Sequence, residues 1–416
     1  MASLNLLGTM TRIETPFISV KIGNYTFGVY DKFEQKNNNN NSSYTLYNVK
    51  YPNYIQSLNV KKINGQVNKY TIIIKYAITS SKDPNFFEKV FSSVSSTRSI
   101  TFSYGDMSMP TYIYKEEEAM ITDIKSQFDF NDSAITYTVT AISSGIISTA
   151  TIDNWDPLIN RRPSDRIKEM LRNNEGGILE VFYGMKDISE FELNRLIPGE
   201  DSPITLDAQT NMSTLDYLKL LVNSMTPQSS LVIRDDSTVY TNKGIYYNYG
   251  GPYFEIKPFK LLDDAETYSI DIGYPSNNIV TSFIVDDNQT YSILYDYSES
   301  IDTTEYVKRI NDDGEVELVY SPSITSNNEN NITHENDSVW WSKVTGFPIS
   351  AQLTLKGLLR PAMLMTHIRV NVLFYGRKHV SSGLYIITQQ IDNIDGNGFR
   401  TTLSLTRVGE DPDSYL

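Results

Sequence analysis

The sequence of 416 residues contains no cysteine and only three histidines, which narrows the chemistry open to it. Without thiols there is no disulfide bridge, no cysteine nucleophile and no thiolate metal site. The histidines are His334, His367 and His379, and no pair of them has the spacing of a zinc motif such as HExxH. We interpret His367 as a core residue with a satisfied ring, and we predict no catalytic residue, no cofactor site and no metal site.

Long apolar runs and basic clusters are also missing. No stretch approaches the length needed to cross a bilayer, and residues 1–17 lack the basic region of a signal peptide, so we expect a soluble protein made in a reducing compartment. The net charge is −14 at pH 7, and Arg161-Arg162 is the one compact basic pair. Tight binding of nucleic acid is therefore not expected, and solubility is the simplest reason for the acidity.

Alternation of apolar and polar residues, which is typical of β-strands, dominates both ends of the chain. The 29 tyrosines and 17 phenylalanines suit half-buried, pleated surfaces. Residues 54–60 and 70–78 are predicted strands around an Asn64-Gly65 turn. Asp83-Pro84 predicts the start of a short helix over residues 84–95. Its apolar stripe is Phe87, Val90, Phe91 and Val94.

Two stretches that are far apart in the sequence share one pattern. Residues 117–144 predict a long hairpin around an Asn131-Asp132-Ser133 turn, and residues 383–406 predict another around a turn at 395–398. Each second strand has an apolar face and a threonine-rich outer face. The similarity indicates duplication, with two related β-barrels at the two ends of the chain. The predicted inward residues are Ile135, Tyr137, Val139 and Ala141 in the first hairpin, and Phe399, Thr401, Leu403 and Leu405 in the second.

Between the barrels, residues 151–265 predict a small mixed α/β insertion, introduced by the prolines at 157 and 163. Ser164 is the predicted cap of a first helix, and Ser213 with Asp216 forms an approximate capping box for a second. Residues 179–183 and 231–234 are predicted short strands. Beyond the insertion, residues 278–285 and 290–297 predict a further hairpin, and residues 326–338 predict a polar loop.

Three further groups of residues each allow a functional interpretation and a structural one. The run Glu116-Glu117-Glu118 could be an acid cluster, but we favour a solvated strand start. The tyrosines at 246, 247, 249 and 253 could stack on a sugar, but we favour a contact with a neighbouring chain. The glycine pairs at 176–177 and 250–251 are interpreted as turns, because no lysine follows them as in a phosphate-binding loop.

The C-terminal segment 346–410, GFPISAQLTLKGLLRPAMLMTHIRVNVLFYGRKHVSSGLYIITQQIDNIDGNGFRTTLSLTRVGE, resembles the closing barrel of phage tail baseplate hub proteins. The likeness lies in its order: the strand at 353–355, the Arg360-Pro361 turn, the strand at 368–374, the segment 382–385 and the last hairpin. Residues 278–283 resemble the strand that opens the later β region of that family. Residues 54–144, with their helix, resemble its first barrel.

This resemblance implies a mainly β (α+β) fold with two tail-tube-like antiparallel barrels and peripheral loops. The first barrel would cover residues 1–150 and the α/β insertion 151–265. Residues 266–345 would form a β-rich segment that contributes to the second barrel, and residues 346–416 its closing strands. The family also implies a non-enzymatic virion protein of the tail baseplate, assembled in the bacterial cytoplasm.

Family members form homotrimers in which two barrels per chain give a pseudo-six-fold ring between a six-fold tail tube and a three-fold central spike. The implied partners are the tail tube protein, the spike, other baseplate proteins and the tape-measure protein. Genomic DNA would pass through the lumen without specific binding, and an acidic lumen would favour that passage. The alternative function is a receptor- or carbohydrate-binding tail protein, which would use the tyrosines near residue 250. A cell-wall-degrading tail enzyme is the third class considered.

Overall fold

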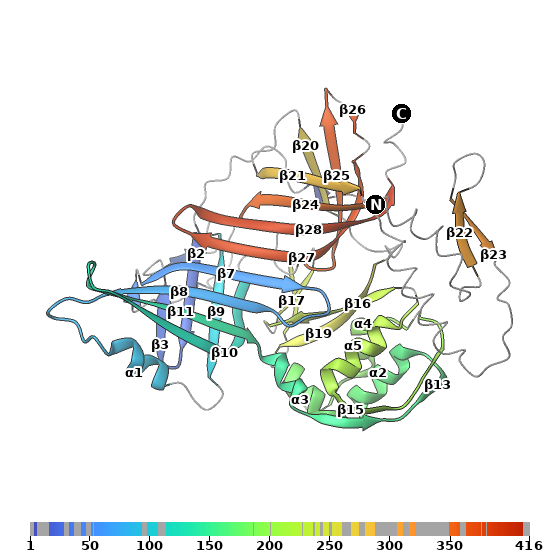
Figure 1. The fold of residues 1–416 in the computed structure, drawn as a ribbon, viewed down its shortest axis with the longest axis horizontal. Coiled ribbons are helices and arrows are strands. Elements are labelled where there is room, and N and C mark those ends of the chain that lie inside the picture. Colours follow the sequence, from blue (N-terminus) through green and yellow to red (C-terminus); the bar gives the residue numbers. More distant parts are fainter. Residues whose placement is uncertain are drawn as a thin grey trace.

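The structure is a computed structural model, and one large, mostly antiparallel sheet runs through it (Figure 1). Six further pairs of strands stand apart from that sheet. The residues that the structure describes are 4–5, 16–28, 33–36, 43–46, 51–52, 54–93, 98–106, 114–185, 187–199, 201–226, 228–235, 238–241, 244–248, 252–259, 268–273, 279–287, 306–310, 316–320, 349–357, 363–375, 377–379 and 381–410.

Four neighbouring strands near the N-terminus form unit A, in the order β7-β8-β11-β10. The sheet continues from β10 through β9, β2 and β3 to β6, and it curls so that Tyr70 on β8 stacks on Phe102 on β9 at 4.7 Å. Helix α1 (Phe86–Ser92) covers one end of this core through Phe87. The strands are β7 (Ile55–Ile63), β8 (Lys69–Ala77), β11 (Ala134–Ser143), β10 (Tyr114–Asp129), β9 (Ser99–Asp106), β2 (Pro16–Ile22), β3 (Tyr25–Gly28) and β6 (Tyr51–Pro52).

Four strands near the C-terminus form unit B, in the order β21-β24-β28-β27. From β27 the sheet continues through β25 to β20 and β1, and β26 pairs with the end of β25. The strands are β21 (Val280–Asp287), β24 (Ile349–Lys356), β28 (Gly398–Glu410), β27 (Gly383–Asp395), β25 (His367–Phe374), β26 (Arg377–Lys378), β20 (Tyr268–Gly273) and β1 (Leu4–Asn5).

The two units repeat one design down to their irregularities. In both long hairpins seven pairs separate the turn from a bulge, at Thr122 on β10 and at Thr388 on β27. Each bulge threonine donates its hydroxyl to a carbonyl oxygen of the partner strand at 3.2 Å. The outer strands β7 and β21 carry a further bulge at matching positions, before Ser57 and Ser282. Because a bulge bends a strand and fixes its register, the match aligns the units residue by residue.

The strand β27 joins the two units into one sheet. Its first residues, 383–386, pair with β25, and residues 389–394 pair with residues 58–63 on β7 of unit A. Both long hairpins therefore point the same way along the sheet, as their turns on the left of Figure 1 show. The two units are thus joined by regular pairing of β27 with β7, and neither unit has an unpaired strand edge where they meet.

The segment between the units has a core of its own. Trp155 stacks on Tyr217 at 4.4 Å, and apolar residues of four helices surround this pair. The segment lies against the end of unit A where β7 turns into β8 (Figure 1), and Gly65 donates its backbone N–H to the Leu231 carbonyl at 2.7 Å. Its elements are η2 (Ser144–Thr149), β12 (Ile152–Trp155), β13 (Leu158–Arg161), α2 (Pro163–Arg172), η3 (Glu175–Gly177), α3 (Ile178–Phe182), α4 (Glu190–Leu196), β14 (Ile204–Leu206), β15 (Gln209–Ser213), α5 (Thr214–Asn223), β16 (Ser229–Arg234) and β19 (Tyr253–Pro258).

Three smaller strand pairs complete the described structure. They are β4 (Phe33–Lys36) with β5 (Ser43–Leu46), β17 (Thr238–Thr241) with β18 (Gly244–Asn248), and β22 (Tyr306–Ile310) with β23 (Val316–Tyr320). Residues 290–297 and 326–338, Val94 and the predicted Arg360-Pro361 turn lie outside the described residues.

The main secondary-structure predictions hold. The chain is mainly β with a mixed α/β segment, and both long hairpins and the Asn64-Gly65 turn are confirmed. The predicted inward residues of both hairpins are buried. Ser213 caps α5 as predicted, since its hydroxyl accepts the Asp216 N–H at 3.1 Å. The boundaries of the four segments remain a prediction.

Three local predictions were wrong. The short helix begins at Phe86, because the carboxylate of Asp83 accepts the Asn85 N–H in a turn that precedes it. Arg162 precedes the first residue of α2, and Ser164 instead donates from its amide and its hydroxyl to Asp201. Residues 179–182 of the predicted strand 179–183 belong to helix α3, because Gly177 adopts a φ of +67° that turns the chain into a new helix.

A substitution of Phe87 tests the packing of the core of unit A. It is fully buried and its ring lies 5.2 Å from those of Phe27 and Tyr137, so Phe87→Ala should lower the free energy of unfolding by about 3–5 kcal/mol. Phe191→Ala, at a ring that is 70% exposed, is the matched control and should change it by less than about 0.5 kcal/mol. Urea denaturation measures both, and equal losses would contradict the assigned packing.

Candidate functional site

The outer face of the large sheet is the most extensive surface that the two units build together. Eight strands contribute to it, in the order β21-β24-β28-β27-β7-β8-β11-β10, and on each the side chains that alternate with the buried ones point outward. Uncharged polar side chains predominate on it. They are Ser57, Asn59, Thr71, Gln127, Thr136, Thr138, Thr140, Ser282, Ser350, Gln352, Thr354, Gln389, Asn393, Thr402, Ser404 and Thr406.

The charge of this outer face differs from that of the whole chain. Among its described residues six basic and five acidic side chains lie on it, which makes it close to neutral, whereas the chain carries −14. The acidic residues expected to line a channel are therefore not concentrated here. The basic residues are Lys61, Lys69, Lys75, Lys125, Lys356 and Arg400, and the acidic ones are Glu118, Asp123, Asp129, Asp286 and Asp395.

A buried polar cluster, which we call the seam network, lies beneath this face where β27 meets β7. Lys62 on β7 forms an ion pair with Glu117 on β10, and its ammonium lies 3.6 Å from the ring centroid of Tyr114. The Tyr114 hydroxyl contacts Gln390 on β27, whose amide nitrogen donates to Asp392 at 2.7 Å. The network thus joins unit A to unit B through side chains as well as backbone.

Its other end reaches the α/β segment. Tyr70 on β8 places its hydroxyl 3.1 Å from Glu117 and 2.6 Å from Asp235, which follows β16. Asp235 also accepts from the Asn68 amide at 2.8 Å and from the Ser143 hydroxyl. One continuous set of contacts therefore holds unit A, unit B and the α/β segment together.

The seam network contains three buried carboxylates and one buried ammonium. Burial raises the pKa of Asp235 to about 6, with Glu117 adding to the effect. Burial also raises the pKa of Asp392 to about 6, although Lys62 opposes the shift. Burial lowers the pKa of Lys62, but Glu117, Tyr114 and Asp392 together outweigh burial, so that pKa is raised and the amine stays charged. Asp235 and Asp392 therefore hold their protons to a higher pH than exposed aspartates do.

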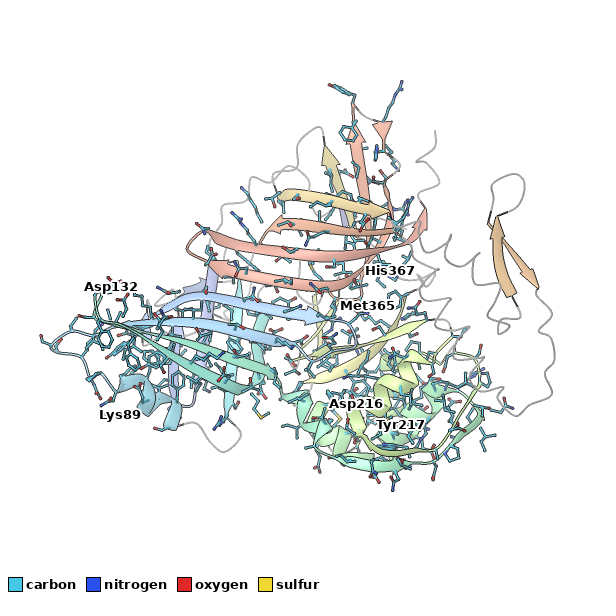
Figure 2. All side chains as sticks on the ribbon, in the orientation of Figure 1. Lys89, Asp132, Asp216, Tyr217, Met365 and His367 are labelled. Carbon is cyan, nitrogen blue, oxygen red and sulfur yellow. The ribbon has the colours of Figure 1, made fainter. Side chains whose placement is uncertain are left out.

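A second buried ion pair fastens the α/β segment to unit B. Arg234 on β16 lies 2.7 Å from Glu255 on β19 and donates to the Leu364 carbonyl at 3.1 Å. Nearby, the His367 ring nitrogen Nε2 lies 2.8 Å from the Phe259 carbonyl oxygen. Figure 2 shows His367 and Met365 at this junction. Burial lowers the pKa of His367, so a neutral ring satisfied by a carbonyl, as predicted for this residue, is what the structure contains.

Two predictions about single side chains were wrong. Glu117 was expected on a solvated strand start, but it is buried, because β10 carries it under the sheet to Lys62. Tyr253 was expected to contact a neighbouring chain, but it is buried in the core of the α/β segment. The side chains of Tyr246 and Tyr247, together with Tyr249, the Gly250-Gly251 pair and His334, lie outside what the structure describes.

The other residues named in the sequence-based predictions form local contacts or turns. His379 lies 2.8 Å from the Ser381 hydroxyl, and Gly176 and Gly177 form the turn before α3. Arg161 pairs with Glu169, and Arg162 donates to the Gly199 carbonyl. Over the described part of the chain, no cluster of three or more His, Cys, Asp or Glu side chains could hold a metal ion. Within the same residues, no helix has the length and apolar character that crossing a membrane requires.

The sequence contained a signal for part of the seam network. Lys62 follows Leu58 and Val60 at inward positions of β7, and Asp392 lies between Gln390 and Ile394 on the inward face of β27. A charged residue in register with core residues is the mark of a buried, paired charge. Asp235 gave no such signal, because it lies in a turn after its strand.

Comparison with solved structures finds chains of similar fold at low sequence identity. The 43 kDa tail protein of prophage MuSo2 from Shewanella oneidensis matches with a TM-score of 0.47 and 10% identity, over 95% of this chain and 99% of that one. A tail protein from Neisseria meningitidis matches with a TM-score of 0.46 and 8% identity, over 94% and 96%. A type VI secretion system component of E. coli, described as similar to T4 phage tail proteins, matches with a TM-score of 0.45 and 10% identity, over 88% and 78%.

No family model matches the sequence, and no curated protein matches it.

The ion pair of the seam network can be tested by a double-mutant cycle. Lys62→Met leaves Glu117 buried without its cation and should cost about 3–5 kcal/mol of unfolding free energy. Glu117→Gln combined with Lys62→Met should cost much less than the sum of the two single changes, because the pair is removed together. Urea denaturation gives each value, and simple additivity would contradict the coupling.

The raised pKa values predict a dependence of stability on pH. Because the folded pKa of Asp235 is about 6 against 3.8 for the free side chain, the folded chain binds more protons between those values. Its stabilising contribution is complete below pH 3.8 and is lost as the pH rises through 6, by at most about 3 kcal/mol. Asp235→Asn should therefore flatten the change in urea midpoint between pH 5 and pH 8, and an unchanged profile would contradict the assignment.

Proposed function

We propose that this chain is a structural hub protein of a phage tail baseplate, with no enzymatic activity. The observation that carries the proposal is the repeat: two four-stranded units with the same strand order and the same bulges lie side by side in one continuous sheet. Such a chain presents two similar faces, so three copies around a three-fold axis would present six.

Six similar units in a trimer would resolve a mismatch of symmetry in the tail. A ring of three chains with six similar units would match a six-fold tail tube on one side and a three-fold central spike on the other. The outer face would line the ring, and its neutral polar side chains suit a passage for the tape-measure protein and genomic DNA. Its hydroxyl and amide groups form hydrogen bonds with water, while its few dispersed charges give no strong field to hold phosphates.

The proposal assigns the chain to the virion, in the tail baseplate, after assembly in the bacterial cytoplasm. Its partners would be a homotrimer of itself, the tail tube protein, the spike, other baseplate proteins and the tape-measure protein. Its structural neighbours include tail proteins and a secretion-system component, which supports the proposal. The receptor- or carbohydrate-binding alternative gains no support from Tyr253, whose ring lies within a core.

The mass of the purified chain in solution tests the proposal. Three copies of 47.3 kDa give about 142 kDa, and we expect size-exclusion chromatography with light scattering to find this trimer. A chain that stays monomeric at every concentration, alone and with a tail tube protein and spike added, would contradict the hub function. Absence of cell-wall-degrading activity in the same preparation is the expected result for a structural protein.

A further inference from the structure

The repeat that joins units A and B within the chain also specifies how one copy meets the next. Within the chain, β27 of unit B pairs with β7 of unit A. By the alignment of the bulges, the counterpart of β27 in unit A is β10, and the counterpart of β7 in unit B is β21. We propose that β10 of one copy pairs antiparallel with β21 of the next copy, in the register of the β27–β7 pair. The inference rests on the proposed hub function.

The edges of these two strands are open over the described residues. β27 pairs with β25 over its first part and with β7 over its second. β10 pairs with β9 over residues 114–120, and past its bulge its outer edge has no strand partner among the residues described. β21 pairs on one side with β24 and, within the same described residues, on the other side with none. Open edges of matching length are the sites at which strands add to a sheet.

Burial at equivalent positions indicates a missing neighbour. Ile394 on β27 is covered by Leu58 on β7 and is 2% exposed. Its counterpart on β10 is Phe128, which points to the same side of the sheet but is 57% exposed. Phe283 is the counterpart of Leu58, and it is only half-buried. The proposed register places Phe128 opposite Phe283, so each would cover the other as Ile394 and Leu58 do.

The same register brings opposite charges together. The pair Ile391 and Lys61 within the chain corresponds to Lys125 opposite Asp286 between copies. Lys125 already lies 3.6 Å from Asp123 on its own strand, and Asp286 is exposed. One residue further, Gln127 would lie opposite Ile284 on the outer face. A slip of one residue would lose both the ring contact and the charge pair, which makes the register specific.

The occupant is therefore a second copy of this chain. The contact is head to tail, with β10 on one copy and β21 on the other, and such contacts close into a ring when the rotation allows. Three copies would give one sheet that passes through every unit without an open edge. The outer face would continue across each interface as it does across the β27–β7 seam.

Because the chain has no cysteine, disulfide trapping tests the register without background. The variant carrying Gln127→Cys and Ile284→Cys should form covalent dimers and trimers on mild oxidation, seen on non-reducing gels. Gln127→Cys with Ser282→Cys is the control, two residues out of register, and should link at least tenfold less. Equal yields from both variants, or a native trimer that does not link, would overturn the register while leaving the hub function standing. A monomer in all conditions would overturn both.

A charge exchange provides an independent measurement. Lys125→Asp should weaken the trimer by about fivefold per interface, because it places two acids opposite each other. Combining it with Asp286→Lys in the same chain should restore the original mass profile at low concentration, since every interface regains an opposite pair. Lys69→Asp, on the outer face but within the sheet, is the control and should leave the trimer unchanged. Failure of the double change to rescue would overturn the pairing.

Discussion

A buried ion pair, connected through hydrogen bonds and charge to two further buried carboxylates, is the constraint on which this structure depends. Burial of a charge is costly unless it is paired and hydrogen-bonded. Lys62 on β7 pairs with Glu117 on β10 and lies within electrostatic reach of Asp392 on β27, while Tyr70 links Glu117 to Asp235 at the end of β16. The relative placement of unit A, unit B and the α/β segment follows from this requirement. Any looser arrangement would leave at least one charge without a partner.

Backbone hydrogen bonds also join unit A to unit B. The β27–β7 pair turns what would be an interface between two domains into a stretch of ordinary sheet. Strand pairing fixes the register to the residue, and the repeated bulges fix the bend of each unit. The pairing of β27 with β7 within one chain is thus the same kind of contact that we propose between copies of the chain.

Charge is distributed to suit the two sides of the sheet. The inner side holds the buried ionisable groups that join the parts, whereas the outer side has mostly hydroxyl and amide groups with acidic and basic side chains in nearly equal number. The net charge of −14 therefore lies mainly elsewhere on the molecule. For a proposed passage this matters, because a surface without a strong field neither holds nor excludes a polyanion.

The sequence by itself determined what depends on neighbours along the chain: the alternation that makes the strands, the Asn64-Gly65 turn, the Ser213 cap of α5 and the two matching hairpins. Which strand pairs with which in the sheet was decided by the tertiary structure alone. Pairing of β27 with β7 depends on residues more than three hundred positions apart, and no local pattern records it. Lys62 and Asp392 stood visibly in register with core residues, but their partners could be known only once the strands met, because a buried charge is satisfied across space.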